Sequence, residues 1–246
     1  MNLLLLEQEE LQGDRLVLND HRATHLRQVL RVEPGSVVRL GIIGGRQGRG
    51  EVLQVSECEV SLRVELAGET ATPPQVELIL ALPRPIMLQR IFKQATVMGV
   101  RRIHLIRTQR VEKSFFASPV LSQEKSRALI LEGMEQAVDT WMPGVHIHQR
   151  FKPFVEDVVP QLPGRGFIAH PHATGTLDEV FIPPSADCPL LLAVGPEGGW
   201  NDYELNAFTN CGFAAFSMGK RILHVDTAVV ALMAQIDLLC QLREKR

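Results

Sequence analysis

Three loops in the last third of the chain carry the residues best suited to hold a ligand. Each follows a short apolar run that predicts a buried strand: "GFIAH" leads into Pro171-His172, "LLLAV" into Gly195–Gly199, and "FSM" into Gly219–Ile222. In an open parallel sheet, ligands bind beyond the carboxyl ends of the strands. Glycine lets backbone N–H and C=O groups approach a ligand closely, and proline stiffens the loop. Together the three loops predict a ligand site built mostly from backbone.

The kind of ligand follows from the pattern of the middle loop. Gly195-Pro196-Glu197-Gly198-Gly199 is not G-x-G-x-x-G and lacks a P-loop lysine, which disfavours a dinucleotide site and a nucleotide triphosphatase. Asn201 is a good helix N-cap, but Asp202 and Glu204 in the first turn would repel a phosphate. A phosphate-free ligand that carries an adenine fits better. Alone, two glycines after a strand often only reverse the chain.

A parallel sheet would bring these loops together, and the second part of the chain has the hydrophobic pattern that is typical of such a sheet. The segment Gly68–Pro74 lacks a hydrophobic period and ends in two prolines, so we place a domain boundary there, between domains at 1–70 and 75–246. Beyond it, near-continuous apolar strands alternate with helices, which predicts an α/β fold with a mostly parallel sheet covered on both faces. The expected strands are 76–82, 102–108, 166–170, 189–194 and 213–218, and the expected helices are 86–100, 121–138, one from Asn201, and 227–242.

The first 70 residues show short strands separated by turns. The expected strands are 15–18, 36–43, 48–55 and 59–66, with one helix that begins at Asn19 or Asp20 and runs through Leu30. A small closed β-barrel is the architecture that this pattern favours.

Composition narrows the class of protein. The chain is 45% hydrophobic with a formal net charge of −2, which argues against a protein that coats nucleic acid by bulk charge. One local exception is the basic segment from Arg84 to Lys113. On charge alone, binding of a nucleic-acid phosphate backbone and a simple solvent-exposed surface explain this segment equally well. The apolar run Leu3–Leu6 is too short for a signal peptide or membrane span, so we expect a cytoplasmic protein. The four scattered cysteines suggest no metal site.

Three longer motifs carry a resemblance to a known family. "HPHATG", "LLLAVGPEGGWNDYEL" and "MGKRILHVDTAVVALMAQ" resemble the SPOUT class of S-adenosylmethionine-dependent RNA methyltransferases. Within that class, the match is to the ribosomal small-subunit methyltransferase E (RsmE) family, which methylates N3 of a uridine in 16S rRNA. "HLRQVLR" is similar to the family's N-terminal PUA-like barrel, and "RIFKQATVMGVRRIHLIRTQRVEKS" to its first catalytic-domain helix and strand. The resemblance implies a C-terminal trefoil knot and a homodimer that acts on 16S rRNA or the small ribosomal subunit.

The resemblance also implies roles for particular residues. It assigns S-adenosylmethionine to His170, Pro171, Gly195, Pro196, Glu197, Gly198, Gly199, Ser217, Met218, Gly219, Ile222 and Leu223. It assigns RNA contacts to Arg31, Lys93, Arg110, Lys113 and Arg221. Glu197 either favours the positive sulfur of the cofactor or is a helix-start carboxylate that faces solvent.

The chain departs from the family at two positions where an arginine is usual. After "RIL" it has His224, Val225 and Asp226, and after Glu135-Gln136 it has Ala137, Val138 and Asp139. One hypothesis is that His224, oriented by Asp226, takes the uridine N3 proton as a base; the alternative is that His224 only packs or binds phosphate. The departures leave two further functions open: an RNA-binding or ribosome-assembly protein of the same fold without catalysis, and a paralogue with another RNA target.

Overall fold

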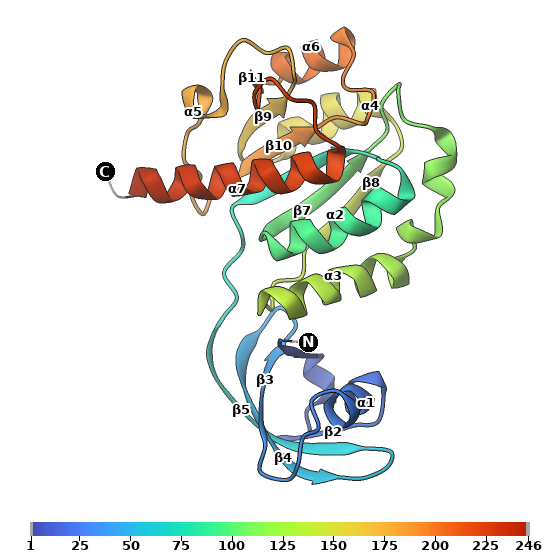
Figure 1. The fold of residues 1–246 in the computed structure, drawn as a ribbon. Coiled ribbons are helices and arrows are strands. Elements are labelled where there is room, and N and C mark those ends of the chain that lie inside the picture. Colours follow the sequence, from blue (N-terminus) through green and yellow to red (C-terminus); the bar gives the residue numbers. More distant parts are fainter. Residues whose placement is uncertain (1, 245–246) are drawn as a thin grey trace. The chain divides into compact units, whose positions relative to one another are not determined.

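The computed structural model describes residues 2–244, which form two compact units. The first unit comprises the chain up to Thr72 together with Met134–Met142, and the second comprises Pro73–Gly133 and the chain from Pro143 onward. Figure 1 shows the elements of each unit in the colours of the sequence. The division after Thr72 falls within the predicted boundary. Met134–Met142 lies inside the predicted second domain, 75–246, whereas the contacts of the structure group it with the first unit.

The first unit is a five-stranded sheet with one helix. Its elements are β1 (Leu4–Leu6), η1 (Gln8–Glu10), β2 (Arg15–Leu18), α1 (His21–Gln28), β3 (Val37–Ile42), β4 (Arg46–Val55) and β5 (Val60–Thr70). The strand order is β1-β3-β4-β5-β2, with β1 parallel to β3 and the other pairs antiparallel. Strand β1 was not predicted, because its run of leucines lacks the alternation of a half-buried strand. No ladder in the described residues joins β1 to β2, so the predicted closed barrel is not confirmed.

Local chemistry explains how α1 begins and how the sheet is filled. The Asp20 side chain accepts a hydrogen bond from the Arg22 backbone N at 2.9 Å, as expected of an N-cap. Leu26 on α1 is fully buried with Leu16, Leu40 and Leu62 from three strands. Burial of such leucines supplies most of the stabilisation of a unit this small.

The segment Met134–Met142 completes the first unit by hydrogen bonds to the turn before β4. Gly44 N donates to Thr140 O at 2.7 Å, and Thr140 Oγ1 donates to Gly45 O at 2.7 Å. The side chain of Gln47 donates to Val138 O at 2.9 Å. Val138 has a φ of 57°, a conformation that a β-branched residue rarely adopts. Contacts between residues so far apart in sequence carry no local signal, so the sequence pattern alone does not connect this segment with the first unit.

The second unit is a six-stranded sheet in which every described pair of strands is parallel. Its strands are β6 (Val76–Ala81), β7 (Val100–Ile106), β8 (Gly144–His148), β9 (Arg165–Ala169), β10 (Leu190–Val194) and β11 (Ala214–Phe216), in the order β11-β9-β10-β6-β7-β8. The α/β prediction with a mostly parallel sheet is confirmed. Strand β8 was missed, because "GVHIH" lies at an edge and presents exposed histidine and isoleucine.

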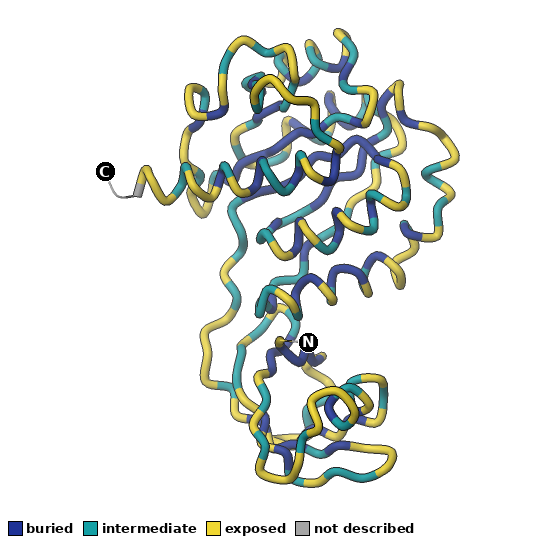
Figure 2. The backbone as a smooth tube through the Cα atoms, viewed as in Figure 1, coloured by how far each residue is buried: buried dark blue, intermediate teal, exposed yellow. Residues whose placement is uncertain are grey.

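Helices and short turns connect these strands. They are α2 (Pro85–Val97), η2 (Lys113–Ala117), η3 (Pro119–Leu121), α3 (Gln123–Ala137), α4 (Phe151–Pro153), η4 (Phe154–Val158), η5 (Val159–Gln161), α5 (Leu177–Val180), α6 (Asp202–Asn210) and α7 (Val225–Glu244). Helices α2 and α7 lie side by side, and α7 also packs on β10 (Figure 1). Every residue of β6 and β10 is buried, so the dark blue of Figure 2 follows the middle of the sheet.

Helix α7 is unusually apolar for its length. Among the described helices it alone is long and apolar enough over Val225–Arg243, with a mean hydropathy of 1.5, to cross a membrane by length and composition. Core helices of soluble proteins pass the same test. Val229 and Leu232 are fully buried, which is how a core helix behaves, whereas Leu238 and Leu242 near its end are exposed.

Candidate functional site

The three predicted ligand loops emerge at one edge of the sheet. Strands β11, β9 and β10 are neighbours and parallel, so the loops that follow them leave from the same carboxyl edge. Backbone bonds tie the loops together: His170 N donates to Phe216 O at 2.9 Å, and Ser217 N donates to Gly175 O at 2.8 Å. The indole Nε1 of Trp200 donates to Ala169 O at 3.1 Å. The sheet therefore brings together residues that are far apart in the sequence, such as His170 and Phe216, which are 46 positions apart.

The glycine-rich loop after β10 has a conformation that depends on its sequence. Gly199 has a φ of 71° and its N donates to Pro196 O at 2.8 Å, which makes a tight turn that other residues adopt only with strain. A Cβ on Gly195 would lie 3.2 Å from the Trp200 indole. The Glu197 carboxylate is exposed, yet its Oε1 accepts a bond from Arg84 N at 3.1 Å. Glu197 is therefore held by the loop between β6 and α2.

The loop after β11 is more open. Ser217 Oγ accepts a bond from Gly219 N at 3.2 Å and lies 3.3 Å from Pro171 O, to which it donates. Gly219 has a φ of 123°, and a Cβ there would meet open space. Ile222 is 81% exposed, more than any other large apolar side chain in the described residues. This loop offers a ligand both backbone groups and an uncovered apolar side chain.

His170 has a buried ring nitrogen, Nδ1, with no hydrogen-bond partner in the described structure. The pKa of His170 lies below its usual range, because burial disfavours the imidazolium form and the nearby His172 repels it. A neutral imidazole can donate or accept a hydrogen bond without repelling a cationic ligand. The His170 ring therefore offers a hydrogen-bond donor or acceptor that does not repel a cation.

The structure gives the two predicted catalytic residues different surroundings. His224 is exposed at the start of α7, where its carbonyl accepts a bond from Ala228 N at 2.8 Å. Asp226 is buried, with Oδ2 3.2 Å from Arg90 Nη1 and Oδ1 accepting from Thr227 N at 3.0 Å. Both oxygens of Asp226 are thus engaged by groups other than His224. The sequence gives no sign of Arg90 as a partner of Asp226, because the two residues are 136 positions apart.

The predicted RNA contacts are spread over both units. Arg31 lies in the first unit, exposed and with a φ of 51°. In the second unit, Lys113 and Arg221 are exposed, and Lys93 forms an ion pair with Glu132. Arg110 donates to carbonyl groups of the glycine-rich loop. Asp139, at the second departure, accepts a bond from Trp141 N at 3.0 Å in the first unit.

Comparison with known proteins places the chain. The family model for the RNA methyltransferase domain matches residues 70–237. The ribosomal RNA small subunit methyltransferase E of Treponema pallidum is 30% identical over 96% of this chain and 90% of its own length. That of Synechocystis is 26% identical over 97% of this chain and 78% of its own length. The chain belongs to the ribosomal RNA small subunit methyltransferase E family.

Solved structures agree on the fold of this methyltransferase E family member. A ribosomal RNA small subunit methyltransferase E from Neisseria gonorrhoeae, bound to S-adenosyl methionine, matches with a TM-score of 0.80. The match covers 97% of this chain and 98% of that one at 21% identity. At this identity the likeness shows the fold, which extends over both units.

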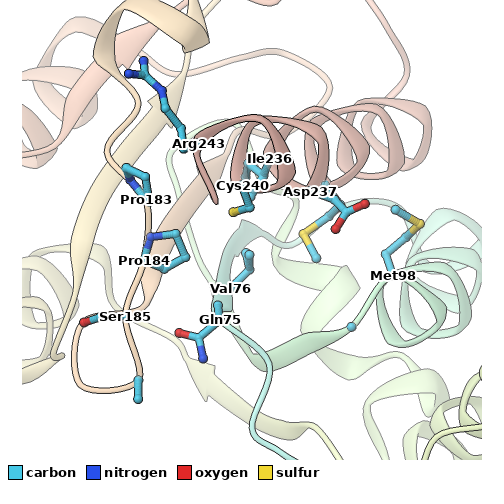
Figure 3. Close-up of a pocket in the computed structure, with 13 residues that line it drawn as sticks. Gln75, Val76, Met98, Pro183, Pro184, Ser185, Ile236, Asp237, Cys240 and Arg243 are labelled. Carbon is cyan, nitrogen blue, oxygen red and sulfur yellow. The ribbon is translucent and has the colours of Figure 1, made fainter. Parts of the chain in front are cut away.

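One cavity of the methyltransferase E family member lies away from the three loops. It has a volume of about 510 Å³ and opens beside the carboxyl-terminal half of α7 (Figure 3). Gln75 and Gly99 line it at the amino ends of β6 and β7, and Pro184 lines it on the approach to β10. The cavity is thus at the opposite edge of the sheet from the candidate site.

A second group of titratable side chains in this family member lies within the sheet itself. We call Glu77, His104, His146 and His148 the histidine cluster. The fully buried Glu77 has Oε2 3.3 Å from His104 Nε2 and Oε1 within 3.6 Å of Arg101 and Arg102 nitrogens. Burial raises the Glu77 pKa, but the His104 hydrogen bond and the arginine charges outweigh it and hold the pKa below its usual value. The sequence offered no signal for this cluster, because β8 was not predicted.

Proposed function

We propose that the protein is an S-adenosylmethionine-dependent RNA methyltransferase that acts on N3 of a uridine in 16S rRNA. Family membership over almost the whole chain is the observation that carries this proposal. The site supports it independently, because three loops meet at one sheet edge without a P-loop lysine or a G-x-G-x-x-G motif.

The loops after β9, β10 and β11 would hold the cofactor. When bound, S-adenosylmethionine supplies an electrophilic methyl group on a positively charged sulfur. The neutral His170 avoids repelling that charge, and the Glu197 carboxylate, held by Arg84 N, favours it. Backbone groups of Gly195, Ser217 and Gly219 would bind the polar groups, and Ile222 would cover apolar surface. The other predicted cofactor residues lie on these same loops.

His224 is our candidate for the proton acceptor at uridine N3. N3 must lose its proton as its electron pair bonds to the methyl carbon, and a neutral imidazole takes such a proton near neutral pH. His224 is exposed at the start of α7, where Arg90 and the buried Asp226 fix the first turn. Asp226 would therefore position α7 rather than orient the imidazole directly. The alternative role of His224, contact with an RNA phosphate, uses the same exposed position.

We further propose the trefoil knot, the homodimer and the cytoplasmic location that the family resemblance implies. The knot rests on the resemblance alone, and the chain after β11 forms a parallel bridge from Ser217 to Thr176 before it continues into α7. The exposed Leu238 and Leu242 on α7 leave apolar surface for a second copy. RNA binding by the first unit, whose sheet would be PUA-like, rests on the resemblance and on the exposed Arg31.

Two measurements test the function. Calorimetry with S-adenosylmethionine should show binding to the purified protein, and an absence of binding would contradict the cofactor site. Mass spectrometry of 16S rRNA nucleosides from a deletion strain should show a loss of 3-methyluridine, which purified protein and cofactor restore. If the protein binds S-adenosylmethionine but does not restore methylation, an RNA-binding protein without catalysis is favoured. That function is the second candidate because His224 and Asp139 stand where the family usually has arginine.

A further inference from the structure

The Arg110 side chain joins the loop after β7 to the glycine-rich loop. Its Nη1 donates to Gly198 O and lies 3.3 Å from Trp200 O and 3.5 Å from Gly199 O. Three successive carbonyl oxygens therefore face one edge of the guanidinium. Hydrogen bonds from a charged donor are about twice as strong as neutral ones, so this contact is one of the charge-assisted bonds that hold the loop, together with the bond from Arg84 N to Glu197 Oε1.

The stem of Arg110 also packs closely against the loop. A Cβ added to Gly198 would lie 3.0 Å from Arg110 Cδ, closer than most real contacts of this kind. Gly199 follows with its φ of 71°, and the loop has one internal backbone bond, from Gly199 N to Pro196 O. A glycine-rich segment has many accessible conformations when it is free. Its native shape therefore depends on contacts from outside the loop.

A separate set of bonds holds the helix that follows the loop. Gln109 N donates to the buried Glu204 Oε1 at 2.7 Å, and Asn201 Nδ2 donates to Gln109 Oε1 at 2.6 Å. Asn201 and Glu204 also form a capping box at the start of α6. Because these bonds do not involve the Arg110 side chain, its removal should loosen the loop and leave α6 in place.

We propose that Arg110 is a positioning residue that fixes the glycine-rich loop in the shape that binds the cofactor. This inference rests on the proposed function of that loop. It differs from the predicted role of Arg110 as an RNA phosphate contact, because the Nη1 donors of this exposed side chain face carbonyls of the loop. Arg110 then sets the affinity for cofactor and leaves the affinity for RNA nearly unchanged.

Calorimetry with S-adenosylhomocysteine on the full chain tests the inference directly. Arg110→Met keeps the stem and removes the donors, and we expect its Kd to rise about 10- to 100-fold, the range for hydrogen bonds to a charged group. Arg110→Lys, with one point charge, should recover part of the affinity. The matched control is Arg107→Met, because the Arg107 contact that the structure records is its backbone N to His148 O at 3.1 Å. Equal affinity of Arg110→Met and wild type would overturn the inference.

Measurements of RNA binding distinguish a positioning role of Arg110 from a direct contact with an RNA phosphate. For Arg110→Met we expect an unchanged RNA Kd, an unchanged salt dependence, a raised KM for cofactor and a kcat that recovers at saturating cofactor. A weaker RNA complex whose salt slope falls by about one would instead assign Arg110 to phosphate and overturn the inference. If wild-type protein binds no S-adenosylhomocysteine, the proposed function fails as well, so the two failures are separable.

A double-mutant cycle tests the packing part of the argument. Gly198→Ala should weaken cofactor binding, because its methyl group pushes the Arg110 stem out of register with the carbonyls. In an Arg110→Ala background the same methyl group meets no stem, so its effect should fall several-fold. Purely additive effects in proteins of equal melting temperature would contradict the inference.

Discussion

The imidazole of His104 lies 3.3 Å from the buried carboxylate of Glu77. The other nitrogen of that ring, Nδ1, lies 3.2 Å from His148 Nε2, so one buried ring joins a carboxylate on β6 to a half-buried histidine on β8. His104 also stacks with both His146 and His148, and Phe154 packs on His104 and His148. The histidine cluster thus ties three strands together with charge and ring contacts.

The stability of the second unit should fall as pH drops from about 6.5 to 4. Burial, followed by repulsion from His104 and His146, lowers the pKa of His148 from 6.5 to about 4. Between these values the unfolded chain binds more protons than the folded chain, so protonation favours unfolding. We expect His148→Gln to flatten this part of a melting-temperature profile by about 2–4 °C. Burial also lowers the pKa of His146, which acts in the same direction.

The exposed His21 in the first unit lies outside the histidine cluster and supplies the matched control, so His148→Gln should flatten the pH profile more than His21→Gln does. The window also separates His148 from Glu77, because stability from an ionised Glu77 is lost only as pH falls below the ordinary carboxyl value of 4.5. An unaltered slope in His148→Gln between pH 6.5 and 4.5 would contradict the assignment.

Glu77→Gln should destabilise the second unit by about 2–4 kcal/mol, because it leaves the charges of Arg101 and Arg102 without their buried carboxylate. Urea unfolding measures the loss. The exposed Asp187→Asn is the control for removing one negative charge and should change the free energy of unfolding by less than about 0.5 kcal/mol. Equal effects of the two substitutions would show that Glu77 has no special role.

Arg90 and Asp226 should be energetically coupled. Arg90→Met leaves the buried Asp226 carboxylate without its cation, whereas the double variant Arg90→Met/Asp226→Asn removes both charges. We expect a coupling energy of about 0.5–2 kcal/mol in urea unfolding, at the lower end because Arg90 is largely exposed. Additivity within error would mean that the ion pair does not hold the start of α7.

His224→Ala should lower methyl transfer about 10²- to 10⁴-fold at saturating cofactor if His224 takes the N3 proton. The exposed Lys125→Ala on α3 is the control and should retain the wild-type kcat. Single-turnover methylation of 16S rRNA gives the rate. A raised KM for RNA with unchanged kcat would assign His224 to a phosphate, and an unchanged rate and KM would remove it from the site.

Gly48→Ala should disrupt the first unit. An added Cβ would lie 2.0 Å from Glu65 O on the paired strand, so β4 and β5 would have to separate. We expect a loss of about 3 kcal/mol or more, as for other overpacked sites. Gly13→Ala is the matched control, because its Cβ meets open space and only its φ of 68° is unfavourable, at about 1 kcal/mol. Similar losses in the two variants would contradict the clash.

The sequence predicted most elements of the second unit, because apolar strands such as β6 and β10 and their helices repeat a clear period. It also predicted the three loops, since glycine and proline mark turns locally. It missed β1, a leucine run without alternation, and β8, an edge strand with histidines. The partners of Arg110 and Asp226 escaped it too, because a hydrogen bond between residues about 90 or 136 positions apart leaves no trace in local pattern.

The return of Met134–Met142 to the first unit constrains how this architecture can be divided or exchanged. A cut between Thr72 and Pro73 would separate the N-terminal sheet from Met134–Met142, the segment whose carbonyl groups accept hydrogen bonds from Gly44 and Gln47. Residues 2–72 alone therefore do not contain the whole of the N-terminal unit. Shuffling it between relatives requires the two sequence pieces to travel together, so insertions and deletions at one junction should be matched by changes at the other.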